Sequence, residues 1–278
     1  YPEGALSILL CSNDDAAPLI DDPRVRMLTF TGSARAGWAI RRRAATKRVT
    51  LELGGNAAVM IEPDADLEHA IRRCVAGGYL YAGQSCISTQ RILVHETLYP
   101  SFTERLVAAV GALRTGDPLS ERTDVGPMID QTSAARAAEW IAEAAAAGAR
   151  IAVGGGRQGA VLEPTVLLDT TSAMRVNCEE IFAPVTTVRP YADLDQAIAI
   201  ANDSRYGIQA GLFTRDLRTI LRTFERLDVG GLVVNDVPGF RVDHAPYGGV
   251  KESGQGREGV RYAIEEMTEL RLLVLGDI

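Results

Sequence analysis

The sequence predicts an α/β fold with parallel sheets, and three observations support this prediction. Strand-like apolar runs alternate with helical patterns from one end of the chain to the other. The helical stretches are long enough to form crossovers between parallel strands. The chain has 278 residues, of which 46% are hydrophobic, so it can bury one large core or two modest ones.

The predicted strands are short apolar runs of the kind that is typical of buried sheets. In chain order they are Leu6–Leu10, Met27–Thr31, Val49–Leu53, Ala57–Ile61, Arg91–Val94, Thr186–Val188, Gly211–Phe213 and Leu232–Asn235. The last residues, Glu269–Ile278, are predicted to form a terminal strand. Because such a strand has an unpaired edge, we expect it to be able to join the sheet of another subunit.

The predicted helices lie between these strands. One of them, over Asp66–Leu80, places five apolar side chains on a single stripe, namely Leu67, Ala70, Ile71, Cys74 and Val75. Two later helices are expected to begin with capping boxes, Ser101 with Glu104 and Asp193 with Gln196. The alanine-rich stretch 131–148 is a good helix former.

Composition excludes several classes of function. The formal net charge is −7, so we expect no nucleic-acid partner and no anionic membrane partner. No apolar run approaches the roughly 20 residues of a membrane helix, and no signal peptide is visible. The four cysteines form no CxxC pair, which indicates a reducing compartment such as the cytoplasm. The three histidines are scattered, so we expect no metal site.

Three local features could carry chemistry. Thr31, Gly32 and Ser33 form a small-residue turn between a strand and a helix, which suits either phosphate binding or an ordinary turn. Glu52 ends a strand among apolar neighbours, so it is either a surface carboxylate or a desolvated general base.

The third feature is Cys86, which follows a Gly-Gln turn at the end of a helix. A free cysteine is either a small buried hydrophobe or a nucleophile. Cys11, Cys74 and Cys178 lack such a setting and are interpreted as structural. A cysteine, a carboxylate and a phosphate-binding turn together suit covalent capture of an aldehyde followed by hydride transfer.

Five motifs then occur in a recognisable order. They are FTGS at 30–33, ELGG at 52–55, GQSC at 83–86, EEIFAPV at 179–185 and PYGGVKESGQGREG at 246–259. In these motifs the chain resembles the aldehyde dehydrogenases, over the later part of a family member. The chain opens on Tyr1, as if in mid-fold, so we expect a C-terminal, catalytic portion that is weakly active or inactive alone.

The resemblance implies a role for each motif. Cys86 would attack the aldehyde and Glu52 would activate the water that hydrolyses the resulting thioester. The cofactor, NAD or NADP, would contact three segments, namely Thr31, Gly32 and Ser33, then Leu53 and Gly54, and finally Glu180 at the ribose with Phe182 near the nicotinamide.

The resemblance also implies a domain organisation. Residues 1–53 would be the remainder of a Rossmann-type cofactor domain, and residues 54–250 the catalytic domain. The chain would return to the cofactor domain over 251–266 and end in an oligomerisation strand over 267–278. A homo-oligomer, either a dimer or a tetramer, is therefore expected.

The substrate is less determined. The run 240–244 resembles a subgroup that acts on small hydroxy-, phospho- or phosphono-aldehydes. Arg241 could bind an anionic substrate group, or it could form a structural salt bridge with Asp243. Two other activities stay open, a CoA-acylating dehydrogenase and a cofactor-independent thiol esterase, although the presence of Glu52 argues against the former.

Overall fold

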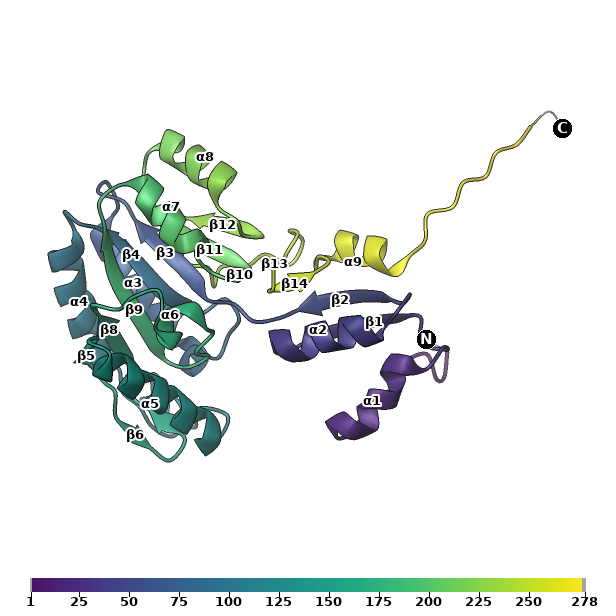
Figure 1. Cartoon of the computed structure of the whole chain (residues 1–278), viewed down its shortest axis with the longest axis horizontal. Coiled ribbons are helices and arrows are strands. Elements are labelled where there is room, and N and C mark those ends of the chain that lie inside the picture. The colour runs from purple at the N-terminus through teal and green to yellow at the C-terminus, as the bar shows by residue number, and fades with distance from the viewer. Residues whose placement is uncertain (1, 277–278) are drawn as a thin grey trace.

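The computed structural model of the chain describes residues 2–276, which form two main sheets joined by a short connection (Figure 1). The larger sheet has seven strands in the order β12-β11-β3-β4-β9-β8-β5, and only the β5–β8 pair is antiparallel. Their bounds are β3 Ala57–Ile61, β4 Thr89–His95, β5 Arg150–Val153, β8 Thr165–Leu168, β9 Val185–Tyr191, β11 Gln209–Phe213 and β12 Gly231–Val234.

Helices cover both faces of this sheet. On one face Val59 of β3 packs into a core with α3 (Leu67–Tyr79), α4 (Tyr99–Gly111) and α5 (Gln131–Ala146). On the other face Met60 packs with α7 (Leu194–Asn202), and α8 (Leu217–Arg226) lies beside α7. Because successive side chains of a strand point to opposite faces, burial on both sides requires the unbroken apolar run of β3.

The smaller sheet has three strands, β1 (Met27–Thr31), β2 (Arg48–Glu52) and β14 (Gly254–Gln255). β1 and β2 are parallel, and β14 returns antiparallel to β2 with Gly254 opposite Glu52. Helices α1 (Asn13–Asp21), α2 (Ala34–Arg43) and α9 (Val260–Met267) accompany this sheet (Figure 1).

The remaining elements are short. They are the 3-10 turn η1 (Leu80–Gly83), α6 (Arg175–Cys178), the hairpin of β6 (Arg157–Gln158) with β7 (Val161–Leu162), and the pair of β10 (Tyr206–Gly207) with β13 (Val250–Lys251). Among residues 2–276, none of the helices combines the length and the apolar character that crossing a bilayer requires.

The α/β prediction is confirmed, and seven of the eight strands predicted as short apolar runs are present. Six of them agree within two residues at each end, and β9 extends three residues beyond the predicted end at Val188. Asp193 caps α7 as predicted, because its side chain accepts from the Gln196 N–H. The Ser101 cap is wrong, since α4 begins at Tyr99 and Leu98 occupies the N-cap position. Pro100 explains the earlier start, because its fixed φ suits the first helical turn.

Both terminal strands are also wrong. Residues 6–10 form coil with exposed leucines, and residues 268–276 extend away from α9 as coil (Figure 1). Residues 277 and 278 of the predicted terminal strand lie outside the described part of the chain. A strand needs a neighbour to accept its hydrogen bonds, and neither segment has one among the described residues.

The three cysteines interpreted as structural differ in how deeply they are buried. Cys74 is buried, as a structural cysteine should be, and burial raises the pKa of its thiol above the ordinary range. Cys11 is exposed and Cys178 is partly exposed, so burial supports a structural role for Cys74 alone. Cys11 follows a segment that packs against nothing, which accounts for its exposure.

Candidate active site

A pocket of about 500 Å³ lies where the two sheets meet. Every residue predicted from the sequence to act in catalysis or cofactor binding lines it, namely Thr31, Gly32, Ser33, Glu52, Leu53, Gly54, Cys86, Glu180 and Phe182. Gln84, Ser85 and Arg136 complete the lining. Arg136 gave no signal in the sequence, because it is one of several charges on the alanine-rich helix α5.

The position of Cys86 depends on an unusual turn. After α3, the backbone of Tyr81, Ala82 and Gly83 adopts positive φ angles of 52°, 54° and 68°. This left-handed run reverses the chain and places Cys86 ahead of β4. A side chain at Gly83 would bring a Cβ within 2.0 Å of the Ala183 carbonyl oxygen, so the turn requires glycine.

Cys86 is partly buried, and its Sγ lies 3.4 Å from the Tyr247 hydroxyl oxygen. Burial raises the pKa of the thiol, and the hydrogen bond with Tyr247 lowers it. Glu180 and Glu52 raise it further, because two nearby carboxylates disfavour a thiolate. Tyr247 is thus the side chain that favours ionisation of this cysteine.

Glu52 is the last residue of β2 and lines the same pocket. Its Oε2 is buried and has no hydrogen-bond partner among the described residues. The pKa of Glu52 is raised to about 7. Burial is the main cause and the charge of Glu258 adds to it, whereas Arg257 and Arg241 act in the opposite direction. A carboxylate that titrates near neutral pH can accept a proton from water, which is what a general base must do.

Glu180 lies against the glycine pair that follows Glu52. The Gly55 N–H donates to Glu180 Oε1 at 2.8 Å, and a Cβ on Gly54 would come within 2.3 Å of Oε2. Burial raises the pKa of Glu180 to about 7 as well. Next to it Phe182 has a φ of 51° and is 38% exposed, so its ring is available to a ligand.

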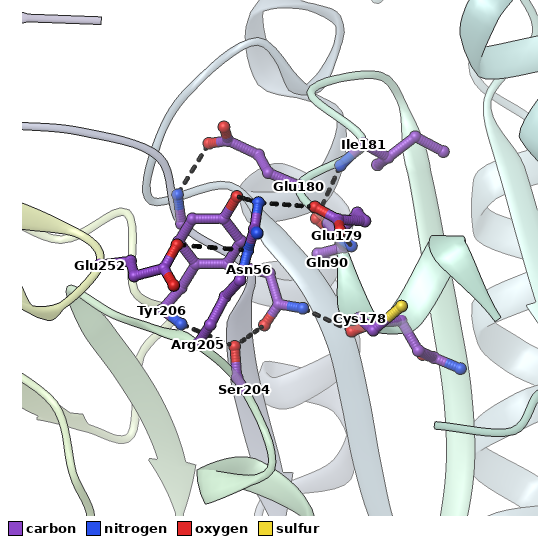
Figure 2. A network of polar contacts seen from close by, with 12 residues as sticks. Asn56, Gln90, Cys178, Glu179, Glu180, Ile181, Ser204, Arg205, Tyr206 and Glu252 are labelled. Carbon is purple, nitrogen blue, oxygen red and sulfur yellow. Dashed lines mark hydrogen bonds and ion pairs between the residues drawn. The ribbon is translucent and has the colours of Figure 1, made fainter. Parts of the chain in front are cut away.

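Residues that the sequence did not reveal hold the Glu180 segment in place (Figure 2). Gln90 of β4 donates to the Glu179 carbonyl at 2.7 Å and accepts from the Ile181 N–H at 3.2 Å. On the other side the Asn56 side chain donates to the Asn177 carbonyl. These polar side chains stand in or beside apolar strands, and their partners lie about 90 to 120 positions away.

The predicted phosphate turn stands at the N-terminus of α2. Ser33 is its N-cap residue, and its Oγ accepts from the Ala36 N–H at 3.3 Å. The Gly32 N–H donates to the Glu52 carbonyl at 3.0 Å, which ties this turn to the strand carrying Glu52. Free N–H groups and the positive end of the helix dipole suit an anion at this point.

Arg241 does not line the Cys86 pocket. It lines a neighbouring pocket of about 310 Å³, together with Phe240 and Tyr247. Its guanidinium pairs with Glu258 at 2.5 Å rather than with Asp243, and it lies 4.2 Å from the centre of the Tyr247 ring. Tyr247 thus lines this second pocket and contacts Arg241, and its hydroxyl also reaches Cys86 of the first pocket.

Comparisons with known proteins agree with this arrangement. The profile of the aldehyde dehydrogenase family matches residues 1–273. The chain is 46% identical to 3-sulfolactaldehyde dehydrogenase of Priestia megaterium, over 99% of this chain and 58% of that protein.

Two solved structures extend the comparison. Aldehyde dehydrogenase 21 from Physcomitrella patens, in complex with the reaction product succinate, superposes with a TM-score of 0.96 at 45% identity, covering 99% of this chain and 57% of that one. Glyceraldehyde-3-phosphate dehydrogenase from Methanocaldococcus jannaschii, complexed with NADP, gives 0.87 at 39% identity, covering 90% and 54%. This chain thus spans somewhat over half the length of the proteins that it matches.

Proposed function

This chain belongs to the aldehyde dehydrogenase family, and we propose that its pocket serves the oxidation of a small aldehyde to a carboxylic acid with NAD or NADP. One observation carries the proposal, namely that Cys86, Glu52 and Glu180 line a single pocket with the first turn of α2. A nucleophile, a base and a place for a phosphate-bearing cofactor are then within reach of one substrate.

In the proposed reaction the Cys86 thiolate attacks the aldehyde carbon and forms a thiohemiacetal. The Cys86 backbone N–H donates to the oxygen that becomes negative in this step. A bound nicotinamide cofactor would supply the hydride acceptor, and Cys86 would then hold the acyl group as a thioester. Glu52 removes a proton from the water that attacks this thioester, and the carboxylic acid leaves with Cys86 restored.

The residues of the pocket fit a nicotinamide dinucleotide. We assign the turn of Thr31, Gly32 and Ser33 to the pyrophosphate, because it presents a helix N-terminus. The Glu180 carboxylate is an acceptor suited to ribose hydroxyls, and the exposed Phe182 ring can pack near the nicotinamide. Leu53 and Gly54 line the wall between these points, where the lack of a side chain at Gly54 leaves room for Glu180.

We propose a substrate that carries an anionic group. The two most informative relatives are named for a sulfonated aldehyde and for succinate as a product. In this chain Arg241 offers a guanidinium in the pocket next to Tyr247, and guanidinium binds sulfonate or carboxylate groups through two donors. Such a group would compete with Glu258 for Arg241.

The domain organisation is proposed on the same basis. Residues 1–53 and 251–266 share a sheet through the pairing of β14 with β2, which supports assigning both to the cofactor domain. Residues 54–250 then form the catalytic domain. The exposed apolar side chains of 270–275 support a homo-oligomer, a dimer or a tetramer.

The first test is formation of NADH or NADPH by the purified chain with a panel of short aldehydes. We expect Cys86→Ala to abolish turnover and Cys11→Ala, which changes an exposed cysteine, to leave it unchanged. Glu52→Gln should slow hydrolysis about 10²-fold or more, so that an acylated Cys86 accumulates and is seen by intact mass. A folded chain that forms neither product nor adduct would contradict the proposal for this chain.

Two further measurements resolve the alternatives. Product analysis with and without CoA separates a carboxylic acid from an acyl-CoA, and only the acid requires Glu52. Arg241→Ala should raise KM about tenfold or more for a sulfonated or carboxylated aldehyde and leave KM for propanal unchanged. If Arg241→Ala left the KM for the anionic aldehyde unchanged, as well as the KM for propanal, Arg241 would not belong to the substrate site.

A further inference from the structure

Tyr247 occupies a position that the proposed reaction does not yet use. Its side chain is only 7% exposed, and its hydroxyl oxygen lies 3.4 Å from Cys86 Sγ. Cys86 is the single hydrogen-bond partner of this hydroxyl among residues 2–276. A buried hydroxyl normally satisfies its hydrogen-bonding capacity, so this contact determines where the phenol points.

Two further contacts hold Tyr247 in place, one through its backbone and one through the face of its ring. Its backbone pairs with Glu258 in both directions, with N–H to carbonyl distances of 3.2 and 2.6 Å. The Arg241 guanidinium lies over the ring face at 4.2 Å from its centre and is itself held by Glu258. Cation–π contact and backbone pairing together leave the phenol little freedom to turn away from Cys86.

The direction of the hydrogen bond follows from the local charges. Burial and the proximity of Cys86 and Glu52 raise the pKa of Tyr247, so the phenol keeps its proton at neutral pH. A thiolate can only accept, and therefore the Tyr247 O–H donates to the sulfur once Cys86 is ionised. The carboxylates of Glu180 and Glu52 act in the opposite sense, because they disfavour negative charge on the sulfur.

We propose that Tyr247 is a further catalytic residue, whose hydroxyl donates a hydrogen bond to the Cys86 sulfur and stabilises the attacking thiolate. The thiol proton leaves to water and Tyr247 retains its own proton. A sulfur lone pair then forms the bond to the aldehyde carbon, while the π electrons of the carbonyl move to its oxygen. The inference rests on the proposed function, because it assumes that Cys86 is the nucleophile. It adds that a side chain of the neighbouring pocket takes part in the chemistry.

The test measures the pH dependence of Cys86 alkylation by iodoacetamide in the full chain and in Tyr247→Phe, with peptide mass spectrometry to follow each cysteine. Loss of one charge-assisted hydrogen bond should raise the apparent pKa of Cys86 by about one unit. The alkylation rate at a fixed pH below that pKa should then fall about tenfold. Cys11 is exposed and serves as the internal reference in every sample.

Tyr191→Phe is the matched control, because Tyr191 is also buried and its hydroxyl bonds the Ile61 carbonyl and Glu62 instead. It should leave the Cys86 profile unchanged. Phenylalanine keeps the ring beneath Arg241, and circular dichroism verifies that both variants fold. An unchanged profile in Tyr247→Phe, or an equal shift in Tyr191→Phe, overturns the inference.

This experiment is independent of the proposed reaction, since alkylation requires neither aldehyde nor cofactor. Aldehyde oxidation that survives Cys86→Ala would refute the proposed function without affecting the alkylation profile. A normal profile in Tyr247→Phe, with oxidation that depends on Cys86, would instead refute the role of Tyr247 alone.

Discussion

The regions around the two sheets differ in how completely they are covered. In the seven-stranded sheet all five residues of β3 and all four of β8 are buried, because helices pack on both faces. In the three-stranded sheet β1 contains no buried residue, since Thr29 and Thr31 are exposed and its other three residues are half-buried. Figure 1 shows the same contrast between the layered body and the extended part that carries β1, β2 and α9.

The candidate site takes a different component from each region. Cys86 and Glu180 come from the covered body, whereas Glu52 and the turn at Ser33 come from the sparsely covered sheet. The glycine pair between β2 and β3 joins them closely, because a Cβ on Gly55 would come within 2.2 Å of the Cys86 carbonyl oxygen. The distance between Glu52 and Cys86 therefore depends on how firmly the smaller sheet is held.

The largest predicted difference is in the cost of removing a leucine side chain. Leu106 of α4 is fully buried in the core of the larger sheet, so Leu106→Ala should lower the free energy of unfolding by about 3 kcal/mol. Leu28 of β1 is half-buried, so Leu28→Ala should lower it by only about 1 kcal/mol. Urea unfolding followed by circular dichroism measures both.

The chain contains two tryptophans, Trp38 in α2 and Trp140 in α5, so each reports on one region. With Trp140→Phe the fluorescence follows the smaller sheet, and with Trp38→Phe it follows the larger one. We expect the Trp38 signal to change at lower urea than the Trp140 signal. If the two tryptophan signals changed at the same urea concentration, and both leucine variants lost the same free energy of unfolding, the two regions would unfold as one unit. The proposed difference in stability between them would then be wrong.

The second prediction concerns the link between the body and the cofactor side of the pocket. Gln90→Leu removes the donor to the Glu179 carbonyl and the acceptor for the Ile181 N–H, and it leaves buried backbone groups unpaired. We expect a loss of about 2 kcal/mol in the free energy of unfolding. Amide hydrogen exchange at Ile181 should become faster, whereas Gln158→Leu, at an exposed position of β6, should change neither quantity. Normal protection at Ile181 in Gln90→Leu would contradict the anchoring role.

The two regions also differ in how well the sequence predicted them. A strand buried on both faces gives a continuous apolar run, so β3 and β9 could be identified from their own residues. The segment 6–10 has the same apolar character, but no neighbouring strand is present to pair with it among the described residues. A sequence pattern reports which side chains prefer burial, and it cannot report whether a partner is there.

The same limit applied to the site. Motifs around Glu52 and Cys86 identified pocket residues because each is a local run with its own turn chemistry. Gln90 and Tyr247 were missed, because their roles arise from contacts with segments about 90 and 161 positions away. Gln90 stands just before the predicted strand 91–94, so the only signal was its place next to a buried strand, where an amide must find partners.

The smallest prediction tests what it costs in stability to place Glu52, the proposed general base, at the junction of the two sheets. The pKa of Glu52 is raised from 4.5 to about 7 in the folded chain, so the folded state holds this proton more firmly than the unfolded state does. The resulting stabilisation is complete below pH 4.5 and is lost as the pH rises through about 7. At pH 8 the ionised Glu52 therefore lowers stability relative to a neutral amide.

Glu52→Gln should accordingly raise the free energy of unfolding by about 1 kcal/mol at pH 8, a value reduced for the partial exposure of this side chain. The difference should shrink towards pH 5, where both side chains are neutral in the folded state. Glu104→Gln, at an exposed position of α4, should show no such pH dependence. If Glu52→Gln gained unfolding free energy at pH 8 and also lost thioester hydrolysis, the smaller sheet would be less stable because it carries the ionised Glu52 that hydrolysis requires. No gain, with no dependence of the difference on pH, would mean that solvent reaches Glu52 freely and that burial does not raise its pKa.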